Sequence, residues 1–173
     1  MKKAKKISIS AVLSALSVVI IYLGAVFDVL DLTACAIASI AIVFAQIELK
    51  GYYPYLIYAT VSIISLLILP QKFSAMLYVC FGGIYPMIKK YAEKYPGARC
   101  LIIKIIGFAL IMTVSLLLLL FVFLTPTAEL FSPYYLAVLL LCAVTFFLYD
   151  YALTLVIAFY FHRLRKKIQR YLK

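Results

Sequence analysis

One acidic residue lies deep inside an apolar stretch of the chain, where its charge is costly. Asp150 belongs to the segment of residues 133–161, roughly 18 Å before His162 if the segment is a helix with a rise of about 1.5 Å per residue. A carboxylate near the middle of a membrane costs several kcal/mol unless it is paired, protonated or hydrated. Asp150 therefore marks a candidate functional position, and its role depends on what it faces.

The surroundings expected for Asp150 contain few charge partners. Lys104 lies nearer the cytoplasmic end, and no other lysine is predicted at the depth of Asp150. The helical neighbours of Asp150 are aromatic, namely Phe146, Phe147, Tyr149 and Tyr151. We expect a protonated carboxyl group that hydrogen-bonds to a tyrosine, a threonine or a backbone carbonyl freed near Pro86. Asp150 is thus predicted to be an intramembrane polar anchor of the bundle rather than a ligand contact.

The groups that catalysis needs do not converge in the sequence. His162, the single histidine, lies among arginines and lysines and has no evident carboxylate or nucleophile partner. Zinc-protease, phosphate-loop and serine-hydrolase motifs are absent, and a di-aspartate protease would need a second intramembrane acid. The cysteines show no CxxC or Cys/His spacing, which favours small buried side chains over a zinc site or disulfides: Cys35, Cys80, Cys100 and Cys142. We predict a protein that is not an enzyme, with no catalytic residues, cofactor or metal.

The composition indicates an integral membrane protein. The chain has 173 residues, of which 68% are hydrophobic and only 13% are charged, and its mean hydropathy is +1.14. Soluble domains are about half apolar and about a quarter charged. The net charge of +11 would suggest nucleic acid as the partner of a soluble protein, but here the basic residues lie in tails and short loops. They are better explained as topology determinants that contact anionic lipid, so no nucleic-acid partner is predicted.

Six segments of the chain are each long enough to cross roughly 30 Å of hydrocarbon. Each is predicted to be an α-helix, because a lipid-exposed backbone must satisfy its hydrogen bonds within its own segment. The predicted fold is therefore all-α, a polytopic bundle of six transmembrane helices in a single domain covering residues 1–173. The helices are expected at residues 7–27, 30–49, 52–69, 73–91, 101–124 and 133–161.

The basic residues fall on one side of such a bundle. All 17 lysines and arginines except Lys72 share that side if there are six crossings, whereas five or seven crossings would destroy the partition. By the positive-inside rule both termini are then cytoplasmic, in a multi-pass protein of a bacterial cell membrane. The basic N-terminus superficially resembles a signal peptide. The apolar segment after it is longer than an h-region and no small-x-small cleavage site follows, so we expect it to be retained.

Lys72 lies in the short outer turn between the third and fourth predicted helices, and its position has two interpretations. It is either a lysine that snorkels to the membrane interface or a donor to an anionic group of an extracytoplasmic ligand.

The fourth predicted helix contains a Gly-Gly pair and a proline. Gly82 and Gly83 allow a neighbouring helix to approach closely, and Pro86 favours a kink. Helix packing accounts for this pattern, although broken helices also line binding sites in transporters.

Small residues form one face of the first predicted helix. Ser10, Ser14 and Ser17 recur with Ala11 and Ala15 at spacings of three and four residues. Such a face lets another helix come close, either within the bundle or from a partner subunit.

Together these features resemble a known family. The chain length, six helices, cytoplasmic termini, basic N-terminus and the sequence Ala11-Val12-Leu13-Ser14-Ala15 are similar to the substrate-binding S components of energy-coupling factor (ECF) transporters. The resemblance covers the whole chain as architecture, but only Ala11 and Ala15 match as residues. It implies that this face docks on a transmembrane coupling subunit, which in turn joins two cytoplasmic ATPases. The chain itself would capture a small molecule for uptake, such as a vitamin or related micronutrient. A metal substrate is disfavoured because the N-terminal histidine motif of the nickel and cobalt branch is absent.

The same resemblance implies a ligand pocket near the outer ends of the last three helices, capped by the outer loops. Placement near that face gives the candidate ligand-binding residues Gln71, Lys72, Tyr78, Glu129, Tyr134 and Tyr135, with Asp28 and Asp31 in the first outer loop. An apolar pocket with a few polar anchors is typical of small-molecule sites.

Two other functions remain open from the sequence. One is a non-catalytic membrane scaffold of cell-envelope or cell-shape assembly, similar in size and helix number to MreD-like proteins. The other is a small proton-coupled carrier that uses Asp150, for which a chain of this size would have to dimerise.

Overall fold

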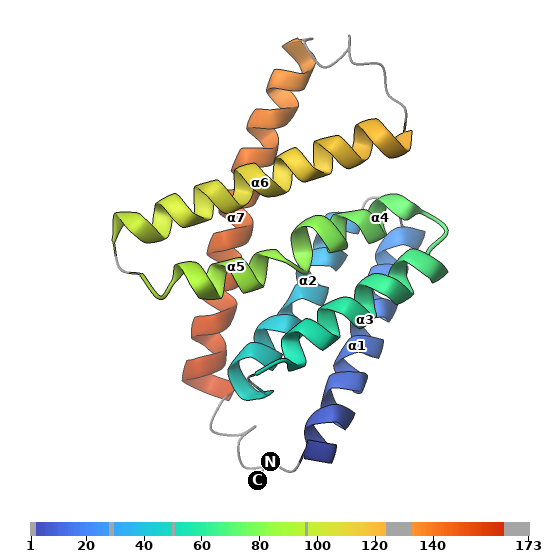
Figure 1. Cartoon of the computed structure of the whole chain (residues 1–173), viewed down its shortest axis with the longest axis vertical. Coiled ribbons are helices and arrows are strands. Elements are labelled where there is room, and N and C mark those ends of the chain that lie inside the picture. The colour runs from blue at the N-terminus through green and yellow to red at the C-terminus, as the bar shows by residue number, and fades with distance from the viewer. Residues whose placement is uncertain (1–2, 28–29, 50, 96, 124–132, 165–173) are drawn as a thin grey trace.

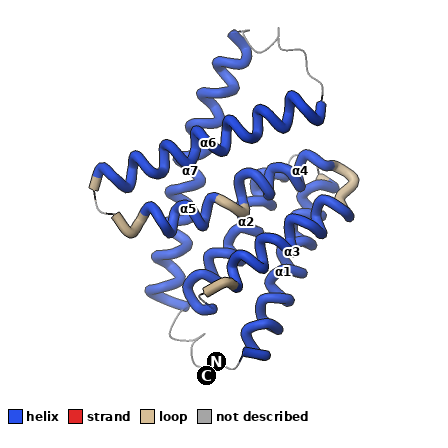
Figure 2. The backbone as a smooth tube through the Cα atoms, in the orientation of Figure 1, coloured by secondary structure: helices blue, strands red, loops and turns tan. Residues whose placement is uncertain are grey.

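A computed structural model of the chain describes residues 3–27, 30–49, 51–95, 97–123 and 133–164, without the side chains of 98, 116–139 and 164. This part of the chain forms six helices and contains no strand (Figure 2). The all-α class predicted from the sequence is therefore confirmed.

The helices begin and end close to the expected residues. The first three are α1 (Lys3–Val26), α2 (Asp31–Phe44) with the π-helical segment η1 (Ala45–Leu49) that continues it, and α3 (Tyr53–Ile68). The fourth comprises α4 (Lys72–Leu77), the π-helical segment η2 (Tyr78–Gly82) and α5 (Tyr85–Ala92). The last two are α6 (Ala98–Phe123) and α7 (Pro133–Phe159), which ends in the π-helical segment η4 (Tyr160–Leu164).

The fourth helix is broken where the glycines and the proline predicted a kink. A turn at Gly83 and Ile84 separates η2 from α5, and Pro86 lies in the first turn of α5, where a missing N–H is tolerated. A Cβ atom at Gly82 would overlap Sγ of Cys35 in α2, and one at Gly83 would overlap the ring of Tyr58 in α3. The glycines therefore permit close packing of this helix, as predicted.

The first four helices share one core, built on small and β-branched side chains. Its central members include Ile21 of α1, Ala38 and Ile42 of α2, and Ile57 of α3, all essentially inaccessible. α2 packs against α1, α3 and α4, and small residues on its surface allow these close approaches.

The second core lies on another side of α2 and joins it to α5, α6 and α7. It contains Val43 of α2, Tyr85 of α5, Ile111 of α6 and Phe146 of α7. α6 crosses α7 steeply in Figure 1, and the rings of Phe108 and Phe146 stack there with centroids 4.3 Å apart. The last helices are thus held to the first four mainly through aromatic contacts.

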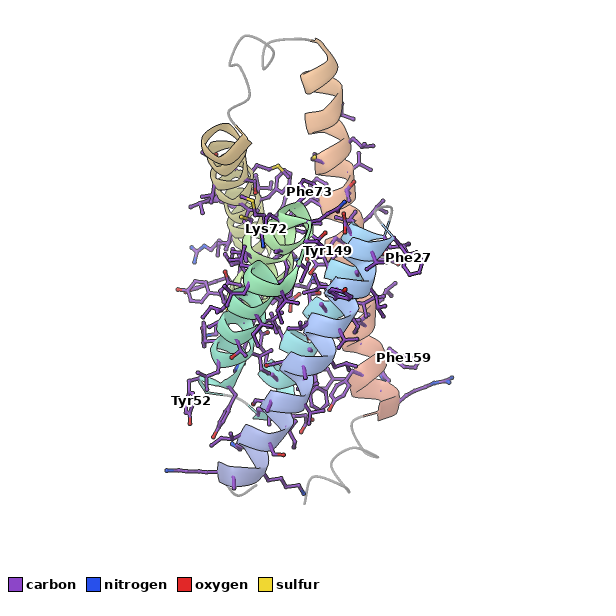
Figure 3. The ribbon with its side chains drawn as sticks, turned by 90° about the vertical axis from the view of Figure 1, so that its right-hand side faces the viewer. Phe27, Tyr52, Lys72, Phe73, Tyr149 and Phe159 are labelled. Atoms are coloured by element: carbon purple, nitrogen blue, oxygen red, sulfur yellow. The ribbon has the colours of Figure 1, made fainter. Side chains whose placement is uncertain are left out.

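The outer surface of the bundle is apolar. Large hydrophobic side chains project from α1, α3, α6 and α7, including Leu67, which is 76% exposed. Phe27 and Phe159 point away from the helices in Figure 3. Among the described residues, three helical stretches are long and apolar enough to cross a membrane: Lys3–Val26, Asp31–Leu49 and Leu140–Arg163. The surface and these helices are compatible with a membrane helical bundle.

The helix ends divide between two sides of the molecule. In Figure 1 the starts of α1, α3 and α6 lie in the lower and left part of the view, with the ends of α5 and α7. The end of α3, the start of α4 and the end of α6 lie toward the top and right. The basic helix ends therefore lie in the lower part of this view and at its left edge, away from the start of α4.

Candidate functional site

A cluster of charged side chains joins α5, α6 and α7 at Asp150. Nζ of Lys89 in α5 contacts Oδ1 of Asp150, and Nζ of Lys104 in α6 lies 2.7 Å from Oδ2. Each carboxylate oxygen thus has its own ammonium partner. The prediction that no lysine reaches Asp150 was wrong.

Neutral groups complete the hydrogen bonding of this cluster. The hydroxyl of Tyr85 donates to Oδ1 of Asp150 at 2.6 Å, as expected for a tyrosine partner. Lys89 also donates to the backbone oxygen of Asp150 at 2.9 Å and to Oγ1 of Thr154 at 2.7 Å. Thr154 in turn donates to that same backbone oxygen at 2.9 Å. The threonine therefore supports Lys89 and the backbone rather than the carboxylate.

Burial differs among the members of the cluster. The side chain of Lys89 is only 2% exposed, whereas those of Lys104 and Asp150 are 16% and 18% exposed. Glu93, one turn after Lys89, is 3.4 Å from its amine but is 41% exposed. A buried ammonium group is strongly unfavourable without acceptors, so Lys89 depends on Asp150 more than Lys104 does.

Aromatic rings enclose the cluster on the side of the bundle core. Tyr85 packs edge-to-face on Phe146 with centroids 4.9 Å apart, and Phe81 lies against Tyr149 at 4.8 Å. Tyr149 faces the interior of the bundle in Figure 3. The rings exclude water from one side of Asp150, which strengthens its interactions with the two lysines.

The sequence contained a signal for these contacts. Tyr85 and Lys89 are four residues apart, as are Asp150 and Thr154, so each pair shares one helix face. The break before α5 and the crossing of α6 over α7 bring both lysines toward Asp150. The position of a residue along its own helix predicts neither the break nor the crossing. The long lysine side chains span the remaining distance.

A cavity of about 200 Å³ lies beside the cluster, between α2 with η1, α5, and the end of α7. Its apolar walls and charged rim are formed by Val43, Gln46, Ile47, Pro86, Lys89, Lys90, Glu93, Lys94, Ile157 and Phe161. Gln71, Lys72 and Tyr78, the ligand-binding candidates whose side chains the structure describes, do not line this cavity.

The structure describes the side chains of only three of those six candidates: Gln71, Lys72 and Tyr78. Lys72 donates to the backbone oxygens of Leu66 and Leu69 at 2.8 and 3.0 Å, so it caps the end of α3, in the upper half of the view in Figure 3. Gln71 is exposed and Tyr78 is fully buried. Glu129 and Asp28 lie outside the described residues, as do the side chains of Tyr134 and Tyr135.

One acid of the first outer loop predicted from the sequence is engaged in packing. Oδ1 of Asp31, at the start of α2, accepts a hydrogen bond of 2.6 Å from the buried hydroxyl of Ser74 in α4. This contact ties the two helices together.

The small-residue face of α1 divides into two parts. Ser10, Ser14 and Ser17 are buried, and the hydroxyl of Ser17 contacts the backbone oxygen of Ala38 in α2 at 3.5 Å. Ala11 and Ala15 are exposed on the outer surface of the same helix. The serines thus pack within the bundle, while the two alanines remain open to a further helix.

The other polar candidates do not form a metal centre within the described part of the chain. No group of three or more His, Cys, Asp or Glu side chains is close enough there to hold a metal ion. All four cysteines are free; Cys35 and Cys80 are buried as expected, whereas Cys100 and Cys142 are only partly buried. His162 is exposed at the end of α7.

Comparisons with known protein families, with curated proteins and with solved structures give no match for this chain.

Proposed function

We propose that this chain is a membrane-embedded capture subunit for uptake of a small molecule, similar to the S components of ECF transporters. In this proposal the chain performs no catalysis. A transmembrane coupling subunit and cytoplasmic ATPases, which are separate proteins, supply the energy.

The proposal places six crossings in the cell membrane, with both termini on the cytoplasmic side. It is supported by the charge partition of the sequence, in which Lys72 alone lies among the outer segments. In Figure 1 the basic helix ends lie in the lower and left parts of the view, away from the start of α4, where Lys72 lies.

The observation that carries the proposal is the exposure of Ala11 and Ala15. These methyl groups lie on the outer surface of α1, while the neighbouring Ser10 and Ser14 pack inside the bundle. In lipid, helices associate where small side chains let their backbones approach, since no hydrophobic drive favours burial of large ones. The exposed alanines therefore offer a partner helix a flat docking strip that the bundle itself does not use.

In this proposal the charge cluster around Asp150 has a structural role. Asp150, Lys89 and Lys104 come from three different helices and satisfy one another, so they can fix how α5, α6 and α7 pack. A buried charged group that is fully paired specifies one arrangement of helices over others.

The test is purification of the tagged chain from its native membranes in mild detergent. We expect a second membrane subunit and ATPases to co-purify, and mass spectrometry to detect a bound small molecule. The double variant Ala11→Trp/Ala15→Trp should lose the partner proteins, because two indole rings would keep the docking helix away from α1. The small molecule should remain bound to the variant.

Matched controls are the exposed alanines of other helices. Ala59→Trp in α3 and Ala152→Trp in α7 add the same ring to an outer surface and should leave the complex intact. The proposed interface would be wrong if the double variant retained the partners. A scaffold function would be favoured if no small molecule were found and the partners were envelope-assembly proteins.

A further inference from the structure

The cavity beside the charge cluster has a composition that neither packing nor the proposed uptake function explains. We propose that it is a binding site for the phosphate group of an anionic ligand with an apolar tail, which the membrane supplies as an acidic phospholipid. This inference rests on the membrane location of the chain and is independent of the proposed substrate capture.

The rim of the cavity carries an excess of positive charge. Lys89, Lys90 and Lys94 line it together with a single acid, Glu93. The amine of Lys89 is already occupied by Asp150 and Thr154. The remaining two lysines are therefore the groups available to an anion.

Lys90 and Lys94 are separated by four residues and border the same cavity. Lys90 makes no hydrogen bond or ion pair with any residue that the structure describes, and Lys94 contacts the ring face of Tyr91 at 5.4 Å. Two like charges at this spacing repel each other, and an anion placed between them removes the repulsion. A phosphate has enough acceptor oxygens to engage both amines.

An amide side chain also lines this cavity. Gln46 in η1 is only 9% exposed, lines the cavity, and forms no hydrogen bond with the described residues. Its side chain offers two N–H donors and one carbonyl acceptor. An amide that lines a cavity and has no partner among the described residues can donate to an oxygen of a phosphate. π-helical segments such as η1 occur frequently at functional sites.

The small volume of the cavity and its apolar lining favour a lipid headgroup over a whole soluble ligand. The cavity volume of about 200 Å³ lies below the roughly 300–1,000 Å³ typical of sites that enclose a drug-sized molecule. Apolar side chains line part of the cavity, namely those of Val43, Ile47 and Ile157. Phe161 also lines the cavity and is 43% exposed at the outer surface. A phosphate could thus lie between Gln46 and the lysines while its tail extends along the apolar outer surface.

The location also matches where acidic lipids are concentrated. The lining residues Lys90, Lys94 and Phe161 lie near the ends of α5 and α7, which the proposed topology places on the cytoplasmic side. Basic pockets between helices on that side bind phosphate-bearing lipid headgroups. The ligand is therefore expected from the inner leaflet.

The test is a titration of the delipidated full chain in detergent, followed by native mass spectrometry. The probes are phosphatidylglycerol, phosphatidylcholine and soluble glycerol phosphate. We expect phosphatidylglycerol to bind most tightly. The double variant Lys90→Gln/Lys94→Gln should weaken that binding by about tenfold or more, since each lysine near an anionic lipid contributes favourably. Gln46→Leu, which keeps the side-chain size, should weaken it by about fivefold.

The matched control is Lys3→Gln/Arg99→Gln, which removes two exposed charges from the same side of the chain but outside the cavity. Circular dichroism and elution volume show whether each variant is folded. The proposal is overturned if the control weakens lipid binding as much as the lysine double variant, or if neither the lysines nor Gln46 affects it. Equal binding of glycerol phosphate, with the same dependence on these residues, would support the phosphate site and assign its ligand to the soluble pool.

Discussion

The amine of Lys104 lies 2.7 Å from Oδ2 of Asp150, across the crossing of α6 and α7, although the two residues are 46 positions apart in the sequence. Lys89 occupies the other carboxylate oxygen. Asp150 is thus the common acceptor of two cations from two different helices, and removing it leaves both without their main partner. Its substitution should therefore affect stability before it affects anything else.

Replacement of Asp150 by leucine should strongly destabilise the bundle. The expected loss is about 3–5 kcal/mol, the usual cost of breaking a buried ion pair from one side, because Lys89 remains buried without its carboxylate. The measurement is thermal unfolding in detergent. It is monitored by a thiol-reactive dye, which reacts with the buried Cys35 and Cys80 when the chain unfolds.

The compensating variant is Asp150→Leu/Lys89→Met/Lys104→Met, which removes all three charges. It should recover most of the lost stability, because apolar side chains of similar volume often replace a buried charge cluster at little cost. Unchanged unfolding of the single variant would show that the ion pairs do not hold the helices together.

The two lysines should not be equivalent. Lys89→Met is expected to cost about 1–3 kcal/mol, because its charged amine donates to three acceptors. Lys104→Met should cost less, since the more exposed amine makes one contact with Asp150.

Lys3→Met is the control for this comparison, because it removes an exposed lysine that belongs to neither the charge cluster nor the cavity. It should leave the unfolding temperature within error. A larger effect for Lys104 than for Lys89 would contradict the difference in burial on which the prediction rests.

The limits of sequence interpretation are clearest at this cluster. The composition, the segment lengths and the Gly-Gly-Pro pattern were sufficient to predict six helices and the break in the fourth, because bilayer thickness and backbone hydrogen bonding constrain each segment separately. The partners of Asp150 depend on how the helices cross. Lys89 was expected at the cytoplasmic end of the fourth predicted helix, residues 73–91, yet in the structure its amine contacts Asp150 of α7. The cavity combines three distant segments and has no signature in any one of them.

The glycine contact between the fourth helix and α2 gives a packing prediction. Gly82→Ala should destabilise the chain by about 1–3 kcal/mol, because the added methyl group would overlap Sγ of Cys35. The second variant, Gly82→Ala/Cys35→Ala, removes that sulfur and should recover part of the stability. Recovery should be incomplete, since the backbone oxygen of Cys35 would still lie 3.2 Å from the new Cβ. Loss of the helical circular-dichroism signal on heating measures both changes.

The glycine at position 107 is a useful comparison. A methyl group there would approach only the side chain of Ile88, whose Cγ2 atom lies 2.9 Å away, so the overlap is smaller than the one with Sγ of Cys35 at 2.2 Å. Gly107→Ala should therefore cost less than Gly82→Ala. Equal costs would mean that backbone and sulfur contacts at Gly82 do not control the approach of the two helices.

The proposed topology can be tested by labelling single introduced cysteines. In the background chain the partly buried Cys100 is replaced by serine and Cys142 by alanine. Gln71→Cys should react with a membrane-impermeant maleimide added to intact cells, because it is exposed in the turn before α4. Arg163→Cys, which is exposed at the end of α7, should react only after the membrane is opened, since the positive-inside rule places the basic end of α7 in the cytoplasm. Cys35 and Cys80, being buried, supply the unreactive background. The reverse pattern would invert the orientation, and labelling of both positions from outside would exclude six crossings with cytoplasmic termini.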